Sequence, residues 1–365
     1  MALKDRLKKR LKDIGPISVA EYMTLCLLDP KDGYYPTRDP LGSEGDFITA
    51  PEISQMFGEV LGLWCIQSWK DMGAPERLNL IELGPGRGIM MSDILRTARL
   101  DPAFFKSLSV TLSEASAALE AVQAKTLANC NVPVSWVDSL QSAPSGPCLI
   151  IGNEFLDCLP IRQFIQKDRF AGAQGWQERM VMLNDNDQLS FGMAPNPISK
   201  ADQNLLPTAH SEAKTDDLLE VSPAAAQIID LLKIRFKAAP GRALFIDYGP
   251  ETTEFGDSLQ AIKRHEKVGV FSNPGNTDLT ARVDFQALAE MAAAIELKAL
   301  HPVTQRAFLS KLGIEMRAVT LTRAQPDSKP KIIRQLHRLM DDKEMGTLFK
   351  TICFGSDELQ SSLGF

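Results

Sequence analysis

Residues 80–88 read LIELGPGRG, and this stretch decides the fold. An apolar run ends in the carboxylate of Glu82, and glycines follow at the alternate positions 84, 86 and 88. Glycine has no Cβ and tolerates positive φ, so such a turn lets a ligand approach the backbone closely. Glycine-rich turns of this kind follow a strand in several nucleotide-binding folds. The spacing of the glycines has to distinguish these folds.

The spacing excludes two nucleotide-binding patterns. A P-loop requires GxxxxGK[ST], and no Lys-Ser/Thr pair follows this turn. A dinucleotide fingerprint requires GxGxxG, but the position of its third glycine is taken by Ile89. The remaining pattern, E-x-G-x-G-x-G, is similar to the first motif of class I S-adenosylmethionine (SAM) methyltransferases. A tight turn without a ligand stays as the alternative. The similarity implies five cofactor-binding residues, with Glu82 near the cofactor's ammonium group: Glu82, Gly84, Pro85, Gly86 and Gly88.

From residue 78 onward, short apolar runs alternate with helical patterns. The runs are LNLIE, SVTLSE, VPVSWVD, PCLIIGNEF and RALFIDYG. This alternation is typical of βα units and a mostly parallel sheet, and strands that are apolar throughout indicate helices on both faces. We therefore predict an α/β fold over 76–365, and the similarity of the glycine turn implies that it is of the class I SAM methyltransferase (Rossmann-like) type. Residues 1–75 are predicted to form an N-terminal helical lid region, and about 165–240 a large insertion before the fifth strand.

Two patterns inside the insertion predict its local structure. QERMVMLNDNDQLSFGM alternates around an Asn-Asp-Asn-Asp turn, which is typical of a β-hairpin. EVSPAAAQIIDLLKIRF predicts a helix that is capped by Ser222 and has Pro223 at its first position.

Acidic residues follow the second and third predicted strands of the core. Glu114 ends SVTLSE, where a carboxylate can accept hydrogen bonds from both hydroxyls of a ribose. Dinucleotide folds place an acid there too, so Glu114 supports an adenosine ligand more than methyl transfer specifically. Asp138, after the next strand, could hold the adenine amino group or cap a helix, and both interpretations remain open.

Composition restricts the class of protein. The 365 residues carry a net charge of −6, so there is no general basic footprint for nucleic acid. Six cysteines without a CxxC pair and four scattered histidines predict no disulfide framework and no metal. No apolar run is long enough for a membrane span.

The first residues, MALKDRLKKRLKDIGP, predict an amphipathic helix, because Leu3, Leu7 and Leu11 recur at helical spacing. Asp5 and Asp13 interrupt the basic charge, which is unlike a transit peptide. On this ground we expect a bacterial cytoplasmic protein in preference to one of the mitochondrial matrix.

Six separated motifs, in order along most of the chain, resemble the MidA-like methyltransferases. They are EGDFITAPEISQMFGE (44–59), IELGPGRG (81–88), GNEFLDCLPIRQF (152–164), FIDYG (245–249), NPGNTDLTARVDF (273–285) and TQRAFLSKLGI (304–314). This is the family of the mitochondrial complex I assembly factor that methylates arginine. The resemblance implies a class I fold, SAM as the methyl donor and arginine of a protein as the acceptor, with a complex I subunit as the protein substrate. A homodimer is kept as a candidate assembly.

The chemistry of an arginine acceptor predicts carboxylates beside the transferred methyl group. A guanidinium is protonated at ordinary pH, so it must be held by acids and lose a proton during the reaction. The fourth strand, PCLII, should place Glu154, Asp157 and Asn153 at the carboxyl edge of the sheet. We expect Glu154 to orient the guanidinium, with Asp157 second and Asn153 as a hydrogen-bond partner. Capping of the following turn is the alternative for Asp157 and Asn153.

The resemblance also implies roles for residues outside the core motifs. Asp46 and Thr49 are expected to fold over the cofactor as part of a lid, although Pro51 could simply open a helix there. Further residues are expected to line the acceptor pocket or shape its far wall: Asp247, Tyr248, Pro274, Asp278 and Thr280. Two other functions stay open, a small-molecule O- or N-methyltransferase and a non-catalytic SAM-binding assembly factor.

Overall fold

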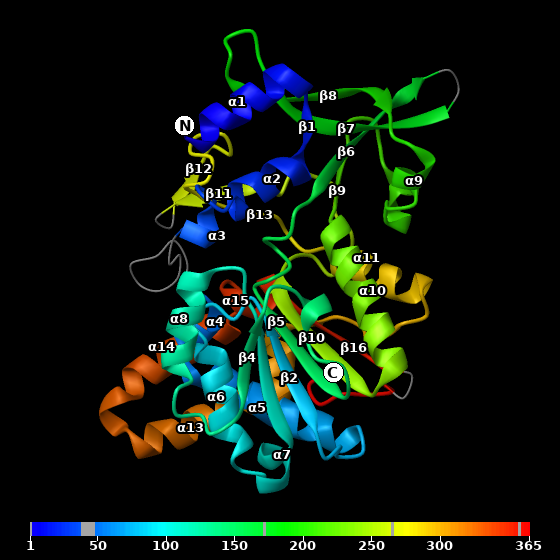
Figure 1. Cartoon of the computed structure of the whole chain (residues 1–365). Coiled ribbons are helices and arrows are strands. Elements are labelled where there is room, and N and C mark those ends of the chain that lie inside the picture. Colours follow the sequence, from blue (N-terminus) through cyan, green and yellow to red (C-terminus); the bar gives the residue numbers. More distant parts are fainter. Residues whose placement is uncertain (1, 38–47, 171–172, 264–265, 357–358) are drawn as a thin grey trace.

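A central eight-stranded sheet organises the computed structural model of the chain, which describes residues 2–37, 48–170, 173–263, 266–356 and 359–365 (Figure 1). The strand order is β14-β16-β10-β5-β2-β3-β4, and β15 also pairs with β16. The five strands from β4 to β10 run parallel, and β16 is antiparallel to β10. The bounds are β2 (Leu78–Leu83), β3 (Leu108–Ser113), β4 (Val134–Val137), β5 (Cys148–Asn153), β10 (Gly241–Tyr248), β14 (Lys298–Ala299), β15 (Val303–Thr304) and β16 (Phe349–Gly355). This arrangement confirms the predicted α/β fold with a mostly parallel sheet.

Helices cover both faces of the sheet, as the apolar strands predicted. Leu149 and Ile151 belong to one core and the intervening Ile150 to the other, because successive strand residues point to opposite faces. One face is covered by α5 (Gln55–Asp71), α6 (Ile89–Ala98), α7 (Pro102–Ser107), α12 (Gln305–Lys311), α13 (Ile314–Ala324), α14 (Lys329–Met340) and α15 (Met345–Leu348). The other face is covered by α10 (Pro223–Ala238) and α11 (Phe285–Ala294). The predicted cap of α10 is confirmed, since the Ser222 side chain accepts the Ala225 N–H.

A second assembly, which we call the cap region, lies at the top of Figure 1, above the central sheet. It contains α1 (Leu3–Ile14), α2 (Val19–Leu28), α3 (Tyr34–Thr37), a five-stranded sheet and a three-stranded sheet. The five strands are β1 (Ile17–Ser18), β6 (Arg162–Phe170), β7 (Ala173–Leu183), β8 (Leu189–Pro197) and β9 (Leu218–Val221). The three are β11 (Gln260–Lys263), β12 (Glu266–Val268) and β13 (Asp278–Thr280). The predicted hairpin is β7–β8, and the predicted N-terminal helix is α1, with Leu3, Leu7 and Leu11 buried in the core of the cap region.

The remaining helical elements are short. They are α4 (Ala50–Ile53), α8 (Ala117–Thr126), α9 (Lys200–Gln203), η1 (Leu140–Ser142), η2 (Thr208–Glu212) and η3 (Pro326–Ser328). Helices α4 and α5 pack into the core of the central sheet, whereas α1–α3 pack into the cap region. The domain boundary near residue 75 stays a prediction. Within the described ranges, no helix combines the length and the apolarity needed to cross a bilayer.

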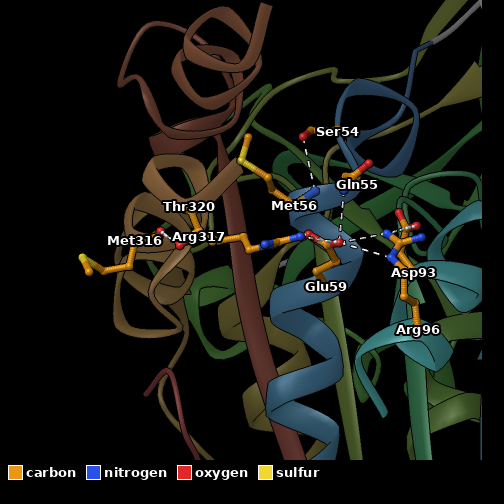
Figure 2. A network of polar contacts seen from close by, with 9 residues as sticks. All are labelled: Ser54, Gln55, Met56, Glu59, Asp93, Arg96, Met316, Arg317 and Thr320. Carbon is orange, nitrogen blue, oxygen red and sulfur yellow. Dashed lines mark hydrogen bonds and ion pairs between the residues drawn. The ribbon is translucent and has the colours of Figure 1, made fainter. Parts of the chain in front are cut away.

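A cluster of ion pairs around two buried carboxylates fixes α6, the helix that follows the glycine turn (Figure 2). The Glu59 carboxylate on α5 accepts hydrogen bonds from Arg96 on α6 at 3.0 Å and from Arg317 on α13 at 2.7 Å. Arg96 also pairs with Asp93 at 2.7 Å. A Cβ on Gly58 would lie 2.6 Å from the Asp93 Cβ, so only glycine allows α5 to approach α6 this closely. The family motif that ends in Gly58-Glu59 therefore has a structural role in holding three helices together.

Candidate active site

A cavity of about 630 Å³ lies where the carboxyl ends of the parallel strands meet the cap region. The strand order reverses on either side of β2, and ligands of open α/β sheets bind at such a switch point. Residues from the ends of β2, β3 and β5 line the cavity, together with residues of α2, α3, α4, α10 and β13. Seven of the lining side chains are carboxylic acids: Glu52, Glu82, Glu114, Asp138, Glu154, Asp157 and Asp278. Among the described lining residues Arg87 is the one basic side chain, so the cavity suits a cationic ligand.

The glycine turn forms one wall of this cavity. Gly84 and Gly86 have φ of 62° and 54° and both line it, together with Pro85. A Cβ on Gly84 would approach the Phe155 ring to 3.0 Å. Gly88 is not among the lining residues and instead stands at the N-cap of α6. The turn thus presents backbone, without side chains, at Gly84 and Gly86.

Glu82 is an acid buried at the end of β2, with an exposed fraction of 2%. Its Oε2 atom is buried and accepts no hydrogen bond from the described residues. Burial, reinforced by the charge of Glu114, raises the pKa of Glu82 from 4.5 to about 8. A buried acceptor without a partner is costly, so this atom fits a ligand that brings a cationic donor. The ammonium group of SAM is such a donor.

Glu114 is held in place by a residue that the sequence analysis missed. Its Oε1 accepts the Ser116 N–H at 2.8 Å, and its Oε2 accepts Nε2 of Gln123 at 2.9 Å. The fully buried Gln123 also donates to the Gly86 carbonyl at 2.7 Å and accepts from Nε1 of Trp136 at 2.8 Å. One side-chain amide therefore joins the glycine turn to the carboxylate predicted to hold the ribose. A single polar residue on the otherwise apolar face of α8 was the signal available in the sequence.

Asp138 lies just before the 3₁₀ turn η1, whose N-cap residue is Ser139. Its Oδ1 accepts the hydroxyls of Ser142 at 2.8 Å and Ser139 at 3.2 Å, and these bonds lower the pKa of Asp138. The same residue lines the cavity. The structure thus gives Asp138 no part in a helix cap, and its contact with a ligand stays a prediction.

The turn after β5 is held in an uncommon conformation by the strand beside it. Glu154 has φ of 50°, a left-handed value that is rare for residues other than glycine and is concentrated at functional sites. Asp247 of β10 stabilises the turn, because its Oδ2 accepts the N–H groups of Phe155, Leu156 and Asp157 at 3.0, 2.8 and 3.2 Å. Asp247 is 1% exposed and does not line the cavity. Its expected place in the acceptor pocket is therefore corrected: its carboxylate is used by three backbone amides.

The side chains of this turn face the cavity. Glu154, Asp157 and Asn153 all line it. Oε1 of Glu154 accepts the Ala50 N–H of α4 at 2.8 Å and Nδ2 of Asn153 at 3.2 Å, while Oδ1 of Asn153 is buried with no partner in the described ranges. Burial raises the pKa of Glu154 to about 7, Asp247 adds to the rise, and the Ala50 N–H opposes it. Burial and then Asp247, Asp278 and Glu154 raise the pKa of Asp157 well above its usual range.

Only some of the residues predicted for the lid and for the far wall line the cavity. Thr49 and Asp278 line the cavity, whereas Tyr248, Pro274 and Thr280 do not. Tyr248 instead donates its hydroxyl to Thr280 at 2.9 Å. Asp46 lies outside the described residues. No group of three His, Cys, Asp or Glu side chains in the described part of the chain is arranged to hold a metal ion.

Known proteins resemble this chain over almost its whole length. A family model described as "Putative S-adenosyl-L-methionine-dependent methyltransferase" matches residues 60–303. "Protein arginine methyltransferase NDUFAF7, mitochondrial" of Homo sapiens is 37% identical, covering 94% of this chain and 81% of its own; that of Xenopus tropicalis is 36% identical, covering 96% and 84%. A crystal structure from Burkholderia thailandensis with bound S-adenosyl-homocysteine (SAH) has 26% identity and a TM-score of 0.85, covering 99% of this chain and 93% of that one.

These relatives overturn the expected cytoplasmic location, because both NDUFAF7 proteins are named as mitochondrial. The expectation rested on Asp5 and Asp13, which are exposed residues of the amphipathic helix α1. Their charges belong to the solvent side of a helix whose leucines are packed in the cap region. They are explained by folding and carry no information about location.

Proposed function

The chain belongs to the family of SAM-dependent methyltransferases whose model it matches, and on that premise we propose that it methylates arginine of a protein substrate. One observation carries the proposal. A single cavity joins the glycine turn and Glu82 to the half-buried carboxyl groups of Glu154 and Asp157. The names of the NDUFAF7 relatives support arginine as the acceptor.

The cofactor half of the cavity fits SAM, on the evidence of the unpartnered Glu82 Oε2 and the bare backbone of the glycine turn. We propose that Glu82 binds the ammonium group and that Gly84, Pro85 and Gly86 contact the methionine part. Glu114 would accept the ribose hydroxyls, Asp138 the adenine amino group, and Thr49 would cover the cofactor. Gly88 would act indirectly, by starting α6. When bound, SAM supplies a methyl group on a sulfonium that is already activated for transfer.

The acceptor half provides charge and a site for a proton. Methylation of a protonated guanidinium releases one proton, which a nearby carboxylate can accept. We propose that Glu154 orients the guanidinium and receives this proton, since its pKa of about 7 is matched to neutral pH. Asp157 would supply a further carboxyl group for hydrogen bonding, and Asn153 Oδ1 a hydrogen-bond acceptor. Positioning of this kind is worth roughly 7–11 kcal/mol in favourable cases.

The finer identity of the partners follows from family resemblance. We propose a subunit of respiratory complex I as the protein substrate, as the resemblance to the MidA-like methyltransferases implies, and a mitochondrial location, in line with the names of the relatives. A homodimer stays a prediction.

Incubation of the purified protein with methyl-labelled SAM and a complex I-bearing extract tests the proposal. Label on arginine of a protein supports it. Label only on lysine or only on small molecules rejects arginine as the acceptor. SAM binding without any transfer would favour the non-catalytic assembly factor.

The burial of Glu82 gives a pH-dependent prediction. Between pH 4.5 and about 8, the folded protein holds a proton on Glu82 that the unfolded chain has lost, so stability falls as pH rises through this window. Glu82→Gln removes this dependence because glutamine does not ionise. From pH 6 to pH 8, wild type should lose about 2 kcal/mol more free energy of unfolding than the variant. Urea unfolding of both ligand-free proteins at the two pH values measures this difference.

The same variant should bind SAM more weakly. Loss of a charged partner for the ammonium group predicts a decrease of about tenfold or more in calorimetric affinity at pH 8. Equal affinity of the two proteins would show that Glu82 is not the ammonium site, and equal pH dependence of their stability would show that the pKa of Glu82 is not raised.

A further inference from the structure

A carboxylate from the cap region lines the same cavity as the acids of the turn after β5. Asp278 stands on β13 with an exposed fraction of 6%, and its Oδ1 accepts the hydroxyl of Tyr35 on α3 at 3.0 Å. Tyr35 lines the cavity as well. The neighbouring residue on the strand, Leu279, belongs to the apolar core of the cap region, so β13 presents its acid on the other face. A buried acid on this edge strand of the cap region requires a reason.

The position of Asp278 relative to Asp157 is fixed by hydrogen bonds. The Ala281 N–H, just beyond β13, donates to the backbone carbonyl of Asp157 at 2.9 Å. Thr280 is bonded to Tyr248 at the end of β10, also at 2.9 Å. These hydrogen bonds link the end of strand β13 to the turn after β5 and to the end of β10, and the charge of Asp278 contributes to the raised pKa of Asp157.

The chemistry of this end of the cavity selects among cations. The acids that line the cavity include Glu154, Asp157 and Asp278, and its walls include the apolar side chains of Leu27, Leu28, Leu159 and Pro160. The buried Oδ1 of Asn153, unpartnered in the described ranges, adds an acceptor to the same cavity. A guanidinium is a planar group with five donors that can be bound on two edges at once, whereas an ammonium is a compact point charge. Acids contributed by two separate elements, with apolar walls for an alkyl chain, suit the guanidinium.

We propose that Asp278, oriented by Tyr35, is a specificity-determining residue that binds the second edge of the acceptor guanidinium. The inference rests on the proposed function, because it takes arginine as the acceptor. It makes the acceptor site composite: Glu154 and Asp157 come from the methyltransferase core, and Asp278 and Tyr35 come from the cap region. Selection of arginine over lysine then depends on the cap region.

The test uses binding and does not depend on catalysis. N-acetyl-L-arginine amide and N-acetyl-L-lysine amide are titrated calorimetrically into the SAH-loaded full-length protein. Wild type should prefer the arginine probe by at least about tenfold, and Asp278→Asn should lower its affinity for that probe by about tenfold or more. Tyr35→Phe, which keeps the carboxylate, should lower it by about threefold to tenfold. Asp257→Asn is the matched control, because it removes the same charge from the cap region at a residue outside the cavity.

Each outcome either supports or contradicts the proposed role of Asp278. SAH affinity within about twofold of wild type shows that a variant is folded; if Asp278→Asn fails this check, the result with Tyr35→Phe decides. No preference for the arginine probe in wild type, or unchanged affinity in a folded variant, overturns the role of Asp278. Failure of the proposed function is recognised separately, as absence of labelled arginine after incubation of wild type with methyl-labelled SAM.

Discussion

Glu154→Gln should lower kcat for arginine methylation by about 10²–10³-fold, the usual cost of removing one preorganised electrostatic group. The substitution keeps the shape of the side chain, and the amide oxygen can still accept the Ala50 N–H that Glu154 accepts at 2.8 Å. Helix α4 and the left-handed turn should therefore stay in place, and SAH affinity should remain within about twofold of wild type. What is lost is the negative charge beside the acceptor and the site for its proton.

A pH profile separates this catalytic role from a structural one. Four groups surround the Glu154 carboxyl or shift its pKa: the Ala50 N–H, the Asn153 amide, Asp247 and Arg338. With a pKa of about 7, Glu154 is protonated in acid, so kcat/KM of wild type should rise with pH and level off above about pH 7. The variant should lack this rise of kcat/KM with pH. Glu220→Gln, a change of the same type outside the cavity, should keep kcat within about threefold. Full activity of Glu154→Gln would remove Glu154 from the mechanism.

The cofactor half of the site could be predicted from sequence because local pattern and topology coincide there. Glu82 and Glu114 each follow an apolar strand, and parallel neighbours necessarily end at the same edge of the sheet. The φ values of 62° at Gly84 and 54° at Gly86 are the reason why the motif contains glycine. A short window of residues thus encodes both the conformation of the turn and its position.

The remaining parts of the site depend on contacts between segments far apart in the chain. Tyr35 and Asp278 are 243 residues apart in sequence, and Gln123 of α8 donates a hydrogen bond to the Gly86 carbonyl of the glycine turn. Nothing in the local pattern around these residues specifies those contacts. For Asp247 the local pattern suggested a role in the site that a contact with another segment excludes. Its place at the end of a strand suggested the acceptor pocket, but three backbone N–H groups of a neighbouring turn use its carboxylate.

Gly84→Val should lower the affinity for SAH by at least about 100-fold, which corresponds to about 2.7 kcal/mol. Two effects combine. A branched side chain is strained at φ of 62°, and its Cβ would lie only 3.0 Å from the Phe155 ring, which itself lines the cavity. Relief of that contact must displace either the glycine turn or the turn that carries Glu154. Calorimetric titration with SAH measures the loss, and thermal unfolding of the ligand-free protein measures the strain.

Gly73→Val provides the matched control, because it introduces the same kind of backbone strain at a position outside the cofactor site. Gly73 has φ of 82° at the end of α5, and a Cβ there would meet no atom within 4 Å. Both variants should therefore lose stability by about 1–3 kcal/mol, since both force a branched residue into the left-handed region. Only Gly84→Val should lose SAH binding. If the two variants bound SAH equally, the glycine turn would owe its sequence to backbone conformation alone, and the cofactor would have to be held elsewhere in the cavity.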